Sequence, residues 1–370
     1  MSSRLPRKWG FPHALLIGLV IVIIASVVFI GFSSTTAFGV YNSNWDGSAG
    51  IRSVAADADV DTTVATSTSE YPQQQTNTIG IILSPDTSYT AAELGAVRSF
   101  VHGGGTLLVA EDFGANGNRV LRGVNSTIRV TGEPLRDEQS YYRSPALPVA
   151  QNVTEHSSTQ GVDQLTLNHA STLTSATDQE LGSSNATNRT VLVRSSEFSY
   201  VDTNRNETLD PEESTGPRPV VAIESVGEGT VVVVSDPSLF INAMLDRPGN
   251  ERFVSNLIVD TDRVLLDYSH HGSQPPLVAA LLWLRRTPLA VALIGLIALG
   301  MIGWWSKREE TTTLVDESET NSMDTSRHMG MDEQAMESYL RERYPDWDDS
   351  QLRRVMTAVF ARRGSGDSNE

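Results

Sequence analysis

The sequence has no cysteine, and it has little histidine and almost no lysine. The absence of cysteine excludes disulfide bonds, thiolate nucleophiles and cysteine-ligated metal sites. Only seven histidines occur in 370 residues. Lys8 and Lys307 are the only lysines, so arginine supplies nearly all of the positive charge.

Positive charge as a whole is also in short supply. The chain carries 28 basic and 45 acidic residues, which gives a net charge of -17. Such a chain repels a polyanion, so nucleic acid is excluded as a partner. A surface rich in aspartate and threonine and poor in lysine is typical of proteins that stay soluble at high salt, which indicates a halophilic habitat.

Two long apolar runs predict transmembrane helices, at residues 11–32 and 288–305. As helices they would be about 33 Å and about 27 Å long, against a hydrocarbon core of roughly 30 Å. Extending the second run toward its N-terminus would bury Arg285 and Arg286 at a cost of roughly 2.5–3.5 kcal/mol each. We therefore expect residues 275–287 to be interfacial. A cleaved signal peptide is the alternative for the first run, whose length exceeds the usual core of about 7–15 residues.

Basic residues before the first run set the orientation. Arg4, Arg7 and Lys8 precede it, which predicts a cytoplasmic N-terminus at residues 1–10. The main domain, residues 33–274, then lies outside the cell in a two-pass membrane protein with both termini cytoplasmic. The inner part comprises an acidic linker at 306–330 and a helical hairpin at 331–363.

The outer segment predicts an α/β fold. Residues 79–84 and 106–110 are apolar runs of strand length, and a capping box at Thr90 and Glu93 opens a helix between them. This strand–helix–strand unit predicts a parallel sheet with a right-handed crossover. Residues 219–225 and 229–236 then predict an antiparallel hairpin. Helices after that hairpin complete a three-layer sandwich.

The cytoplasmic end predicts two helices separated by Pro345. One face of the second helix is apolar, with side chains spaced at helical intervals. These are Leu352, Val355, Met356, Val359 and Phe360. Either the two helices bury each other, or this face is a docking site for a cytosolic partner.

The stretch VHGGGTLLVAED, residues 101–112, contains the His-Gly-Gly-Gly signature of lipase oxyanion holes. Here the signature follows a helix and precedes a strand, and no GxSxG elbow occurs in the chain. We therefore expect the glycines to end the helix, because glycine adopts the positive φ that such ends require.

Four carboxylates follow the predicted strands: Asp86, Glu111, Asp112 and Asp236. The carboxyl edge of an open α/β sheet is where such folds bind ligands. These residues could bind a ligand or cation there or act as acid and base, or they could cap the following helices.

Residues 202–213, DTNRNETLDPEE, match the oxygen-ligand spacing of a calcium-binding EF-hand loop. The predicted ligands are Asp202, Asn204, Asn206, Thr208 (through its carbonyl), Asp210 and Glu213. Glu207 stands where the pattern has glycine, and flanking helices are missing. The segment is therefore either an isolated calcium loop or an acidic turn adapted to salt.

Two weaker patterns complete the candidates. N-x-[ST] sequons, potential glycosylation sites, begin at Asn125, Asn152, Asn185, Asn188 and Asn206. The adjacent His270 and His271 do not favour a metal site, since adjacent side chains point in different directions and no cysteine is available.

Several pieces in this order resemble a family of membrane-anchored proteins called domain of unknown function 4350. They are YNSNWDGSAG, TAAELGAVRSFVHGGGTLLVAED, GEGTVVVVSDPSLFINAML, NERFVSNLI and DYSHHG. The family's outer domain is similar to class I glutamine amidotransferases and to auxiliary proteins of gliding-motility ABC transporters. The resemblance implies a flavodoxin-like three-layer sandwich. It also implies an envelope assembly, because members are often encoded beside MoxR-type ATPases.

The resemblance argues against catalysis. Amidotransferases use a cysteine nucleophile after a buried strand, and this chain reads LLVAEDFG there. We therefore expect a non-catalytic envelope protein that binds a protein, glycan or small ligand outside and docks a cytosolic partner, such as the ATPase, through its tail. The alternatives are a carboxylate- or metal-dependent hydrolase and a structural surface protein stabilised by calcium.

Overall fold

The computed structural model describes residues 34–72, 77–177, 181, 188–272 and 333–364, with short pieces within 15–26 and 276–300. The chain divides into two compact units, Met1–Leu281 and Leu282–Glu370. No helix among the described residues is long and apolar enough to cross a bilayer. The predicted N-terminal segment, the two spans, the interfacial segment and the linker lie wholly or largely outside the described residues.

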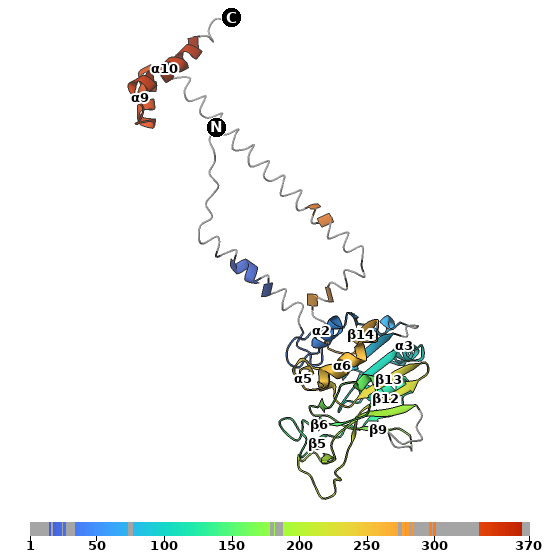
Figure 1. The fold of residues 1–370 in the computed structure, drawn as a ribbon. Coiled ribbons are helices and arrows are strands. Elements are labelled where there is room, and N and C mark those ends of the chain that lie inside the picture. Colours follow the sequence, from blue (N-terminus) through green and yellow to red (C-terminus); the bar gives the residue numbers. More distant parts are fainter. Residues whose placement is uncertain are drawn as a thin grey trace. The chain divides into compact units, whose positions relative to one another are not determined.

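The larger unit is built on one sheet of eight strands, in the order β1-β14-β2-β3-β13-β12-β10-β7. They are β1 (Asp61–Ala65), β2 (Thr78–Leu83), β3 (Thr106–Ala110), β7 (Asn152–Val153), β10 (Arg189–Arg194), β12 (Pro219–Val226), β13 (Gly229–Val234) and β14 (Arg263–Asp267). The first five strands in that order run parallel, and the remaining pairs are antiparallel. The prediction of a mixed α/β fold with a large, parallel-rich sheet is confirmed (Figure 1).

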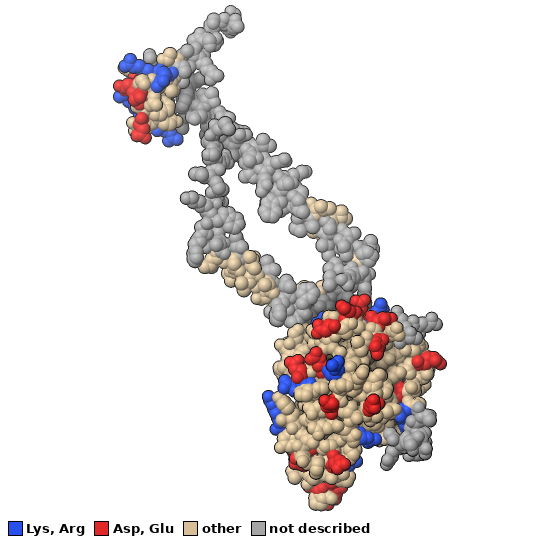
Figure 2. All heavy atoms as spheres, viewed as in Figure 1, with Lys and Arg blue, Asp and Glu red and all other residues tan. Residues whose placement is uncertain are grey.

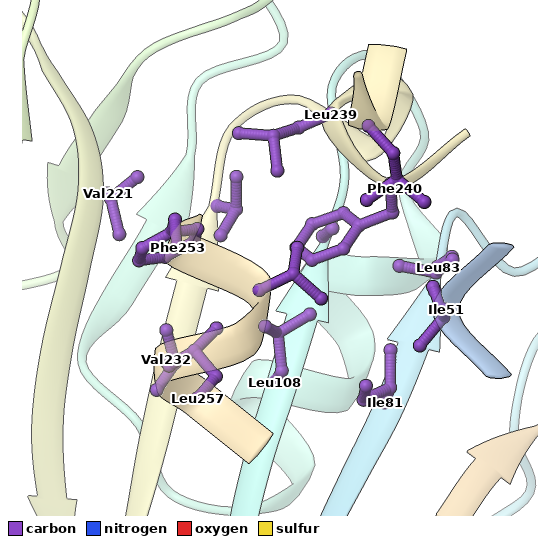
Figure 3. Packing of buried hydrophobic residues seen from close by; sticks show 14 of the residues in the cluster. Ile51, Ile81, Leu83, Leu108, Val221, Val232, Leu239, Phe240, Phe253 and Leu257 are labelled. Carbon is purple, nitrogen blue, oxygen red and sulfur yellow. The ribbon is translucent and has the colours of Figure 1, made fainter. Parts of the chain in front are cut away.

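Helices cover both faces of this sheet. Two clusters of buried apolar side chains lie between the helices and the sheet, one on each face. They are separate because alternate residues of each strand point to opposite faces. Ile81 and Leu108 pack with α2 (Gly50–Asp57) and α6 (Asn250–Ile258), as Figure 3 shows for Ile51, Phe253 and Leu257. Their neighbours Ile82 and Leu107 pack with α3 (Ala91–His102) and α4 (Asn116–Gly123) on the other face.

One of the helices predicted after the hairpin, over residues 237–245, was wrong. A helix predicted from PSLFINAML is a 3₁₀ turn, η3 (Pro237–Phe240), followed by a single α-turn, α5 (Asn242–Leu245). Ile241 between them is extended, with φ -78° and ψ 155°, which interrupts the helix. The apolar run RVLLD, for which we predicted no strand, is β14, which lies between β1 and β2 in the sheet.

The described part of residues 123–216 consists mainly of short strands joined by long loops. Its strands outside the main sheet form three two-stranded pairs, β4 with β9, β5 with β11 and β6 with β8. They are β4 (Ile128–Val130), β5 (Leu135–Asp137), β6 (Val149–Ala150), β8 (Leu165–Thr166), β9 (Leu173–Ser175) and β11 (Ser199–Val201). Two further 3₁₀ turns are η1 (Thr68–Glu70) and η2 (Ser157–Thr159).

The smaller unit is the predicted helical hairpin. It consists of α9 (Glu333–Arg343) and α10 (Asp349–Gly364). Met336, Leu340 and Leu352 are buried between the two helices. Asp348 caps α10, since its Oδ1 accepts hydrogen bonds from the backbone N–H groups of the second and third residues that follow it. The helices thus bury each other, and docking of a partner stays a prediction.

Candidate functional site

The glycines after His102 end α3 and form no oxyanion hole. Gly104 has a φ of +102°, which favours glycine. Its N–H donates to the carbonyl of Val101, and the N–H of Gly105 donates to the carbonyl of Phe100. These two bonds define a Schellman motif, which satisfies the last carbonyls of a helix.

Glu111, at the carboxyl end of β3, is completely buried. Its Oε1 accepts hydrogen bonds from the Ser84 hydroxyl (3.2 Å) and from the N–H groups of Asp112 (3.2 Å) and Gly114 (3.1 Å). Its Oε2 accepts one from the N–H of Gly117 at 3.1 Å. Burial raises the pKa of this carboxyl above its ordinary value. Glu111 therefore organises the loop between β3 and α4 from inside.

The two glycines around Glu111 make room for it. A Cβ added to Gly114 would lie 2.6 Å from either carboxylate oxygen, and one added to Gly117 would lie 2.6 Å from the Cβ of Glu111. Real Cβ atoms do not approach so closely. The sequence EDFGANG after β3 thus forms a loop that closes tightly around the buried side chain of Glu111.

Asp236, at the carboxyl end of β13, is also completely buried. It caps η3, because its Oδ1 accepts from the N–H of Ser238 at 2.7 Å, and its Oδ2 accepts from the N–H of Asn168 at 2.7 Å. Burial, followed by the negative charge of Asp112, raises the pKa of Asp236 to about 7. Burial also raises the pKa of Asp112, which His169 partly opposes.

The structure thus brings three of the four predicted carboxylates to one stretch of the sheet edge. Asp86 lies apart from them. It is exposed, and its backbone N–H donates to the carbonyl of His270 beyond β14. Ligand binding at this edge stays a prediction.

A small cavity of about 170 Å³ opens at this edge. Phe113, whose side chain is 42% exposed, lies beside His169 in its wall. Leu135, Pro134 and Ala146 contribute apolar surface. The charged wall consists of Arg136, Asp202, Arg205 and Glu207. The cavity is smaller than the roughly 300–1,000 Å³ of drug-sized sites, so it suits one side chain or one sugar ring.

Sequence reasoning missed most of this cavity. Its residues come from five separate stretches of the chain, and no motif links them. Phe113 carried a local signal, since it is a large apolar side chain in the polar, glycine-rich stretch EDFGANG that follows the buried strand β3. The meeting of these stretches depends on long-range packing, which no local pattern encodes.

The predicted calcium loop supplies three of the four charged residues in the cavity wall. Asp202 is buried, and its Oδ2 lies 3.1 Å from Nε of Arg136. The N–H of Asn206 donates to Oδ1 of Asp202, and the side-chain amides of Asn204 and Asn206 both donate to Oδ2 of Asp210. These hydrogen bonds link four of the predicted ligands to one another, although the described carboxylates form no group of three that could hold a metal ion.

Glu207 departs from the calcium pattern as expected. It occupies the glycine position and adopts a left-handed backbone with a φ of +66°. Its carboxylate reaches back to Arg136 at 3.1 Å. Glu213 closes the loop, because its Oε1 accepts from the N–H of Thr203 and its Oε2 from the N–H of Asp210. Thr208 donates its N–H to Oδ1 of Asn206. Calcium binding stays a prediction.

The two adjacent histidines have different surroundings. His270 stacks on Tyr89 at 3.5 Å between ring centroids, and its Nε2 lies 3.4 Å from a carboxylate oxygen of Glu93. His271 stacks instead on Tyr268. Within the described ranges, no group of three or more His, Cys, Asp or Glu side chains could hold a metal ion.

The described sequon asparagines are all exposed: Asn125, Asn152, Asn188 and Asn206. Asn185 lies outside the described residues. Asn206 also belongs to the loop at the cavity, where its side-chain amide donates to Asp210. A glycan on that nitrogen would leave it a single N–H for this hydrogen bond.

The sequence model of a family described as "Domain of unknown function (DUF4350)" matches residues 40–258. The chain is similar to the mmIFT52 N-terminal domain, at 17% identity over 48% of this chain and 74% of that one, with a TM-score of 0.37. It is also similar to cytoplasmic protein STM1381 from Salmonella typhimurium LT2, at 12% identity over 58% and 85%, with a TM-score of 0.31. No curated protein matches the sequence. Neither structural similarity is high enough to carry an argument.

Proposed function

The chain belongs to the DUF4350 family, and on that premise we propose that it is a non-catalytic binding protein of the cell envelope. Its larger unit would bind a protein, glycan or small ligand at the cavity beside Phe113. Its smaller unit would dock a cytosolic partner, for which the family resemblance suggests a MoxR-type ATPase. The finer likeness of the larger unit to a flavodoxin-like amidotransferase sandwich is part of this proposal.

The observation that supports this proposal is that the buried carboxylates at the ends of the strands stabilise the fold. Glu111 accepts four internal hydrogen bonds and is completely buried. A general base must come within about 3 Å of the proton it removes, and no substrate can approach Glu111 so closely. The exposed group at this edge is the ring of Phe113, which offers contact and no chemistry.

The cavity wall favours a ligand with both apolar and polar groups. The guanidinium of Arg205 lies 5.7 Å from the ring centre of Phe113, so one face of that ring already meets a cation. Arg136 is held in place by Asp202 and Glu207. An aromatic ring surrounded by fixed charged groups is the arrangement that small-ligand sites use to set orientation.

The competing function is a hydrolase that uses Asp112 and Asp236. Their mutual repulsion and the raised pKa of Asp236 are features of paired catalytic carboxylates. Asp236, however, is completely buried, and both of its oxygens accept backbone hydrogen bonds. Asp112 alone would have to act on substrate, which leaves the acid and base pair incomplete.

Anchoring in a membrane completes the proposal. Large apolar side chains in the described pieces of both predicted spans are about half exposed or more, including Leu15 (60%), Ile21 (60%) and Leu296 (67%). Exposed apolar surface of this kind needs a cover. A bilayer would cover both runs, whereas water would leave them unstable.

A crosslinking experiment in native membranes tests the proposed binding site. We would replace Phe113 with a photoreactive benzoylphenylalanine and use Phe198, which is 49% exposed, as the matched position outside the cavity. We expect a discrete product from position 113 that is absent from position 198. The same products at both positions would count against the site.

A substitution pair separates binding from catalysis. Asp112→Asn preserves side-chain size but cannot act as a base, whereas Phe113→Ala removes the contact surface. If the protein binds without catalysis, Asp112→Asn keeps the crosslinked partner and Phe113→Ala weakens its capture. Loss of the cellular function with Asp112→Asn, at an unchanged Tm, would favour the hydrolase.

A further inference from the structure

A turn carrying one exposed tryptophan lies where the chain enters the larger unit. Trp45 is 69% exposed, the most exposed large aromatic side chain among the described residues of this unit. Tryptophan favours the interface between membrane and water, because its ring is apolar and its N–H still finds a polar partner. An unburied tryptophan so placed calls for an explanation.

The turn, residues 34–48, is firmly held. The N–H of Ser34 donates to the carbonyl of Tyr41, and the N–H of Phe38 donates to the carbonyl of Asp46. The hydroxyl of Ser48 donates to the carbonyl of Phe38 at 2.7 Å. Trp45 therefore projects from a cross-linked turn and not from a loose end.

Asn242 fixes this turn to the body of the unit. Its side-chain amide donates to the carbonyls of Asn42 and Asn44, and its Oδ1 accepts from the N–H of Gly50 at the start of α2. The N–H of Ala243 donates to the carbonyl of Trp45 itself at 3.0 Å. The position of Trp45 is thus set by the fold.

The exit of the chain lies beside its entry. A Cβ added to Gly272 would lie 3.2 Å from Oγ1 of Thr36. Gly272 follows β14, and Figure 1 shows β14 and α2 at one end of the unit, with β5 and β6 at the other. Both connections therefore leave from the end that carries Trp45.

Both connections to the predicted membrane segments are short. Ser34 follows the first apolar run, 11–32, by two residues, and the interfacial segment begins three residues after Gly272. An extended chain spans at most about 3.5 Å per residue, so the tethers reach roughly 7 Å and 10 Å. The headgroup layer on each side of a bilayer is itself about 5–7 Å thick. Tethers of this length hold the end of the unit against the membrane surface.

We propose that turn 34–48 rests on the bilayer surface, with the ring of Trp45 among the lipid headgroups. The proposal depends on the membrane anchoring proposed above. Arg52, whose guanidinium lies 5.8 Å from the ring centre of Tyr41, adds a cation and a second aromatic ring next to this turn. The larger unit thus has a fixed orientation on the membrane, and its other end, with β5 and β6, points away from the lipid.

The chain is well suited to a test by site-directed spin labelling, because it has no native cysteine. Trp45→Cys in the full-length protein, reconstituted in liposomes, would carry the single nitroxide. Its collision rates with oxygen, which enters lipid, and with a water-soluble nickel chelate give the depth of the label. Phe198→Cys, on the loop that bonds to β5 through Glu138, is the matched exposed aromatic at the far end.

We expect the ratio of oxygen to nickel accessibility to be several-fold higher at position 45 than at position 198. Ser43→Cys, an exposed neighbour on the same turn, should give the same result if Trp45→Cys folds poorly. Equal ratios at positions 45 and 198 would overturn the proposal. So would a label at position 45 that neither reagent reaches, since a protein partner would then cover it.

A label at Leu19→Cys separates this inference from the anchoring itself. If that label lies deep in hydrocarbon while position 45 is in water, the anchor stands and the contact of the turn is wrong. If the label at position 19 is itself in water, the membrane anchoring fails and the contact fails with it.

Discussion

At the scale of single residues, the buried carboxylates of the sheet edge show how a charged side chain can serve a loop. Glu111 and Asp236 each accept backbone N–H groups that would otherwise be unsatisfied. A buried donor without a partner costs about 1–3 kcal/mol. Each carboxylate therefore offsets part of its own desolvation by ordering the segment that follows a strand.

Asp236 gives the residue scale a pH-dependent prediction. Its pKa is about 7 in the folded protein against an ordinary value of 3.8. The folded state therefore holds a proton that the unfolded state has lost, and stability falls as pH rises from 4 toward 7. Asp236→Asn removes this titration, so the decline of about 1.4 kcal/mol per pH unit from this group should disappear.

Urea unfolding between pH 4.5 and 7 measures the effect. Asp236→Asn also leaves one backbone N–H poorly paired, so the variant should be less stable than wild type at pH 4.5. Asp163→Asn, at an exposed aspartate, is the control and should keep the wild-type slope. A slope that is the same in wild type and Asp236→Asn would show that Asp236 does not titrate in this range.

Residue types and their positions after strands could be predicted from sequence, but their partners could not. The sequence placed Glu111, Asp112 and Asp236 at the carboxyl ends of strands, and the structure brings them together there. The bond from Asn168 to Asp236 spans 68 residues, and no local pattern carries it. Such long-range contacts decide whether a carboxylate at the end of a strand is available to a ligand or caps the following turn.

At the scale of elements, α3 shows how capping residues set the two ends of a helix. The Thr90 side chain accepts from the N–H of Glu93, and the Glu93 side chain accepts from the N–H of Thr90, which is the predicted capping box. Gly104 ends the helix with a positive φ. Both ends of the helix could be predicted from the sequence, because caps depend on residues within one turn of the helix.

A pair of glycine substitutions tests this account. Gly104→Ala forces a side chain into the left-handed region and should destabilise the protein by roughly 1–2 kcal/mol. Gly95, in the interior of the same helix, faces open space. Gly95→Ala should stabilise by roughly 0.5–1 kcal/mol. The melting temperatures should move in opposite directions, and a fall in both would refute the assignment of Gly104 as the helix end.

The loop of residues 202–213 carries the calcium prediction. If it binds calcium, millimolar calcium should raise the Tm, because a ligand that binds only the folded state stabilises by about 2.7 kcal/mol at a hundredfold excess over Kd. Asp202→Ala should abolish the rise. That variant also removes the buried partner of Arg136, so Asp210→Asn is the better probe: it removes one charge and leaves the ion pair of Arg136 with Asp202 intact.

The control for calcium is magnesium at the same ionic strength, since screening of an acidic surface would stabilise the protein with either ion. A rise in Tm that is equal for both ions, or that survives in Asp210→Asn, would identify the segment as an acidic, salt-adapted turn. Figure 2 shows why the control matters, because acidic side chains outnumber basic ones over the visible face of the larger unit.

Among the elements, those built from local contacts were predicted well. The strands at 79–84 and 106–110 and the hairpin at 219–236 all occur within a residue or two of their expected limits. The place of β14 between β1 and β2 was not predicted, since pairing between residues 61–65 and 263–267 depends on bringing distant chain segments together. A strand of five residues has too few positions for its sequence pattern to predict which distant strand it pairs with.

At the scale of the whole molecule, the chain consists of two compact units with separate cores. The larger has clusters on both faces of its sheet, and the smaller has a core of Met336, Leu340 and Leu352. The sequence predicted a separate hairpin after an acidic linker at residues 306–330, whereas the boundary between the two units falls between Leu281 and Leu282. The protein partners of either unit could not be predicted, since none of the motifs found in the sequence specifies a protein.

The closeness of Thr36 and Gly272 has a consequence for how the chain could be cut and rejoined. A domain whose two ends touch behaves as an insertion, which a neighbouring scaffold tolerates with little change to its own geometry. A few glycines joining Thr36 to Gly272 would close the larger unit into a circle. New termini could then open at the exposed tip of the loop around Leu209, and the circularly permuted domain should retain its eight-stranded sheet.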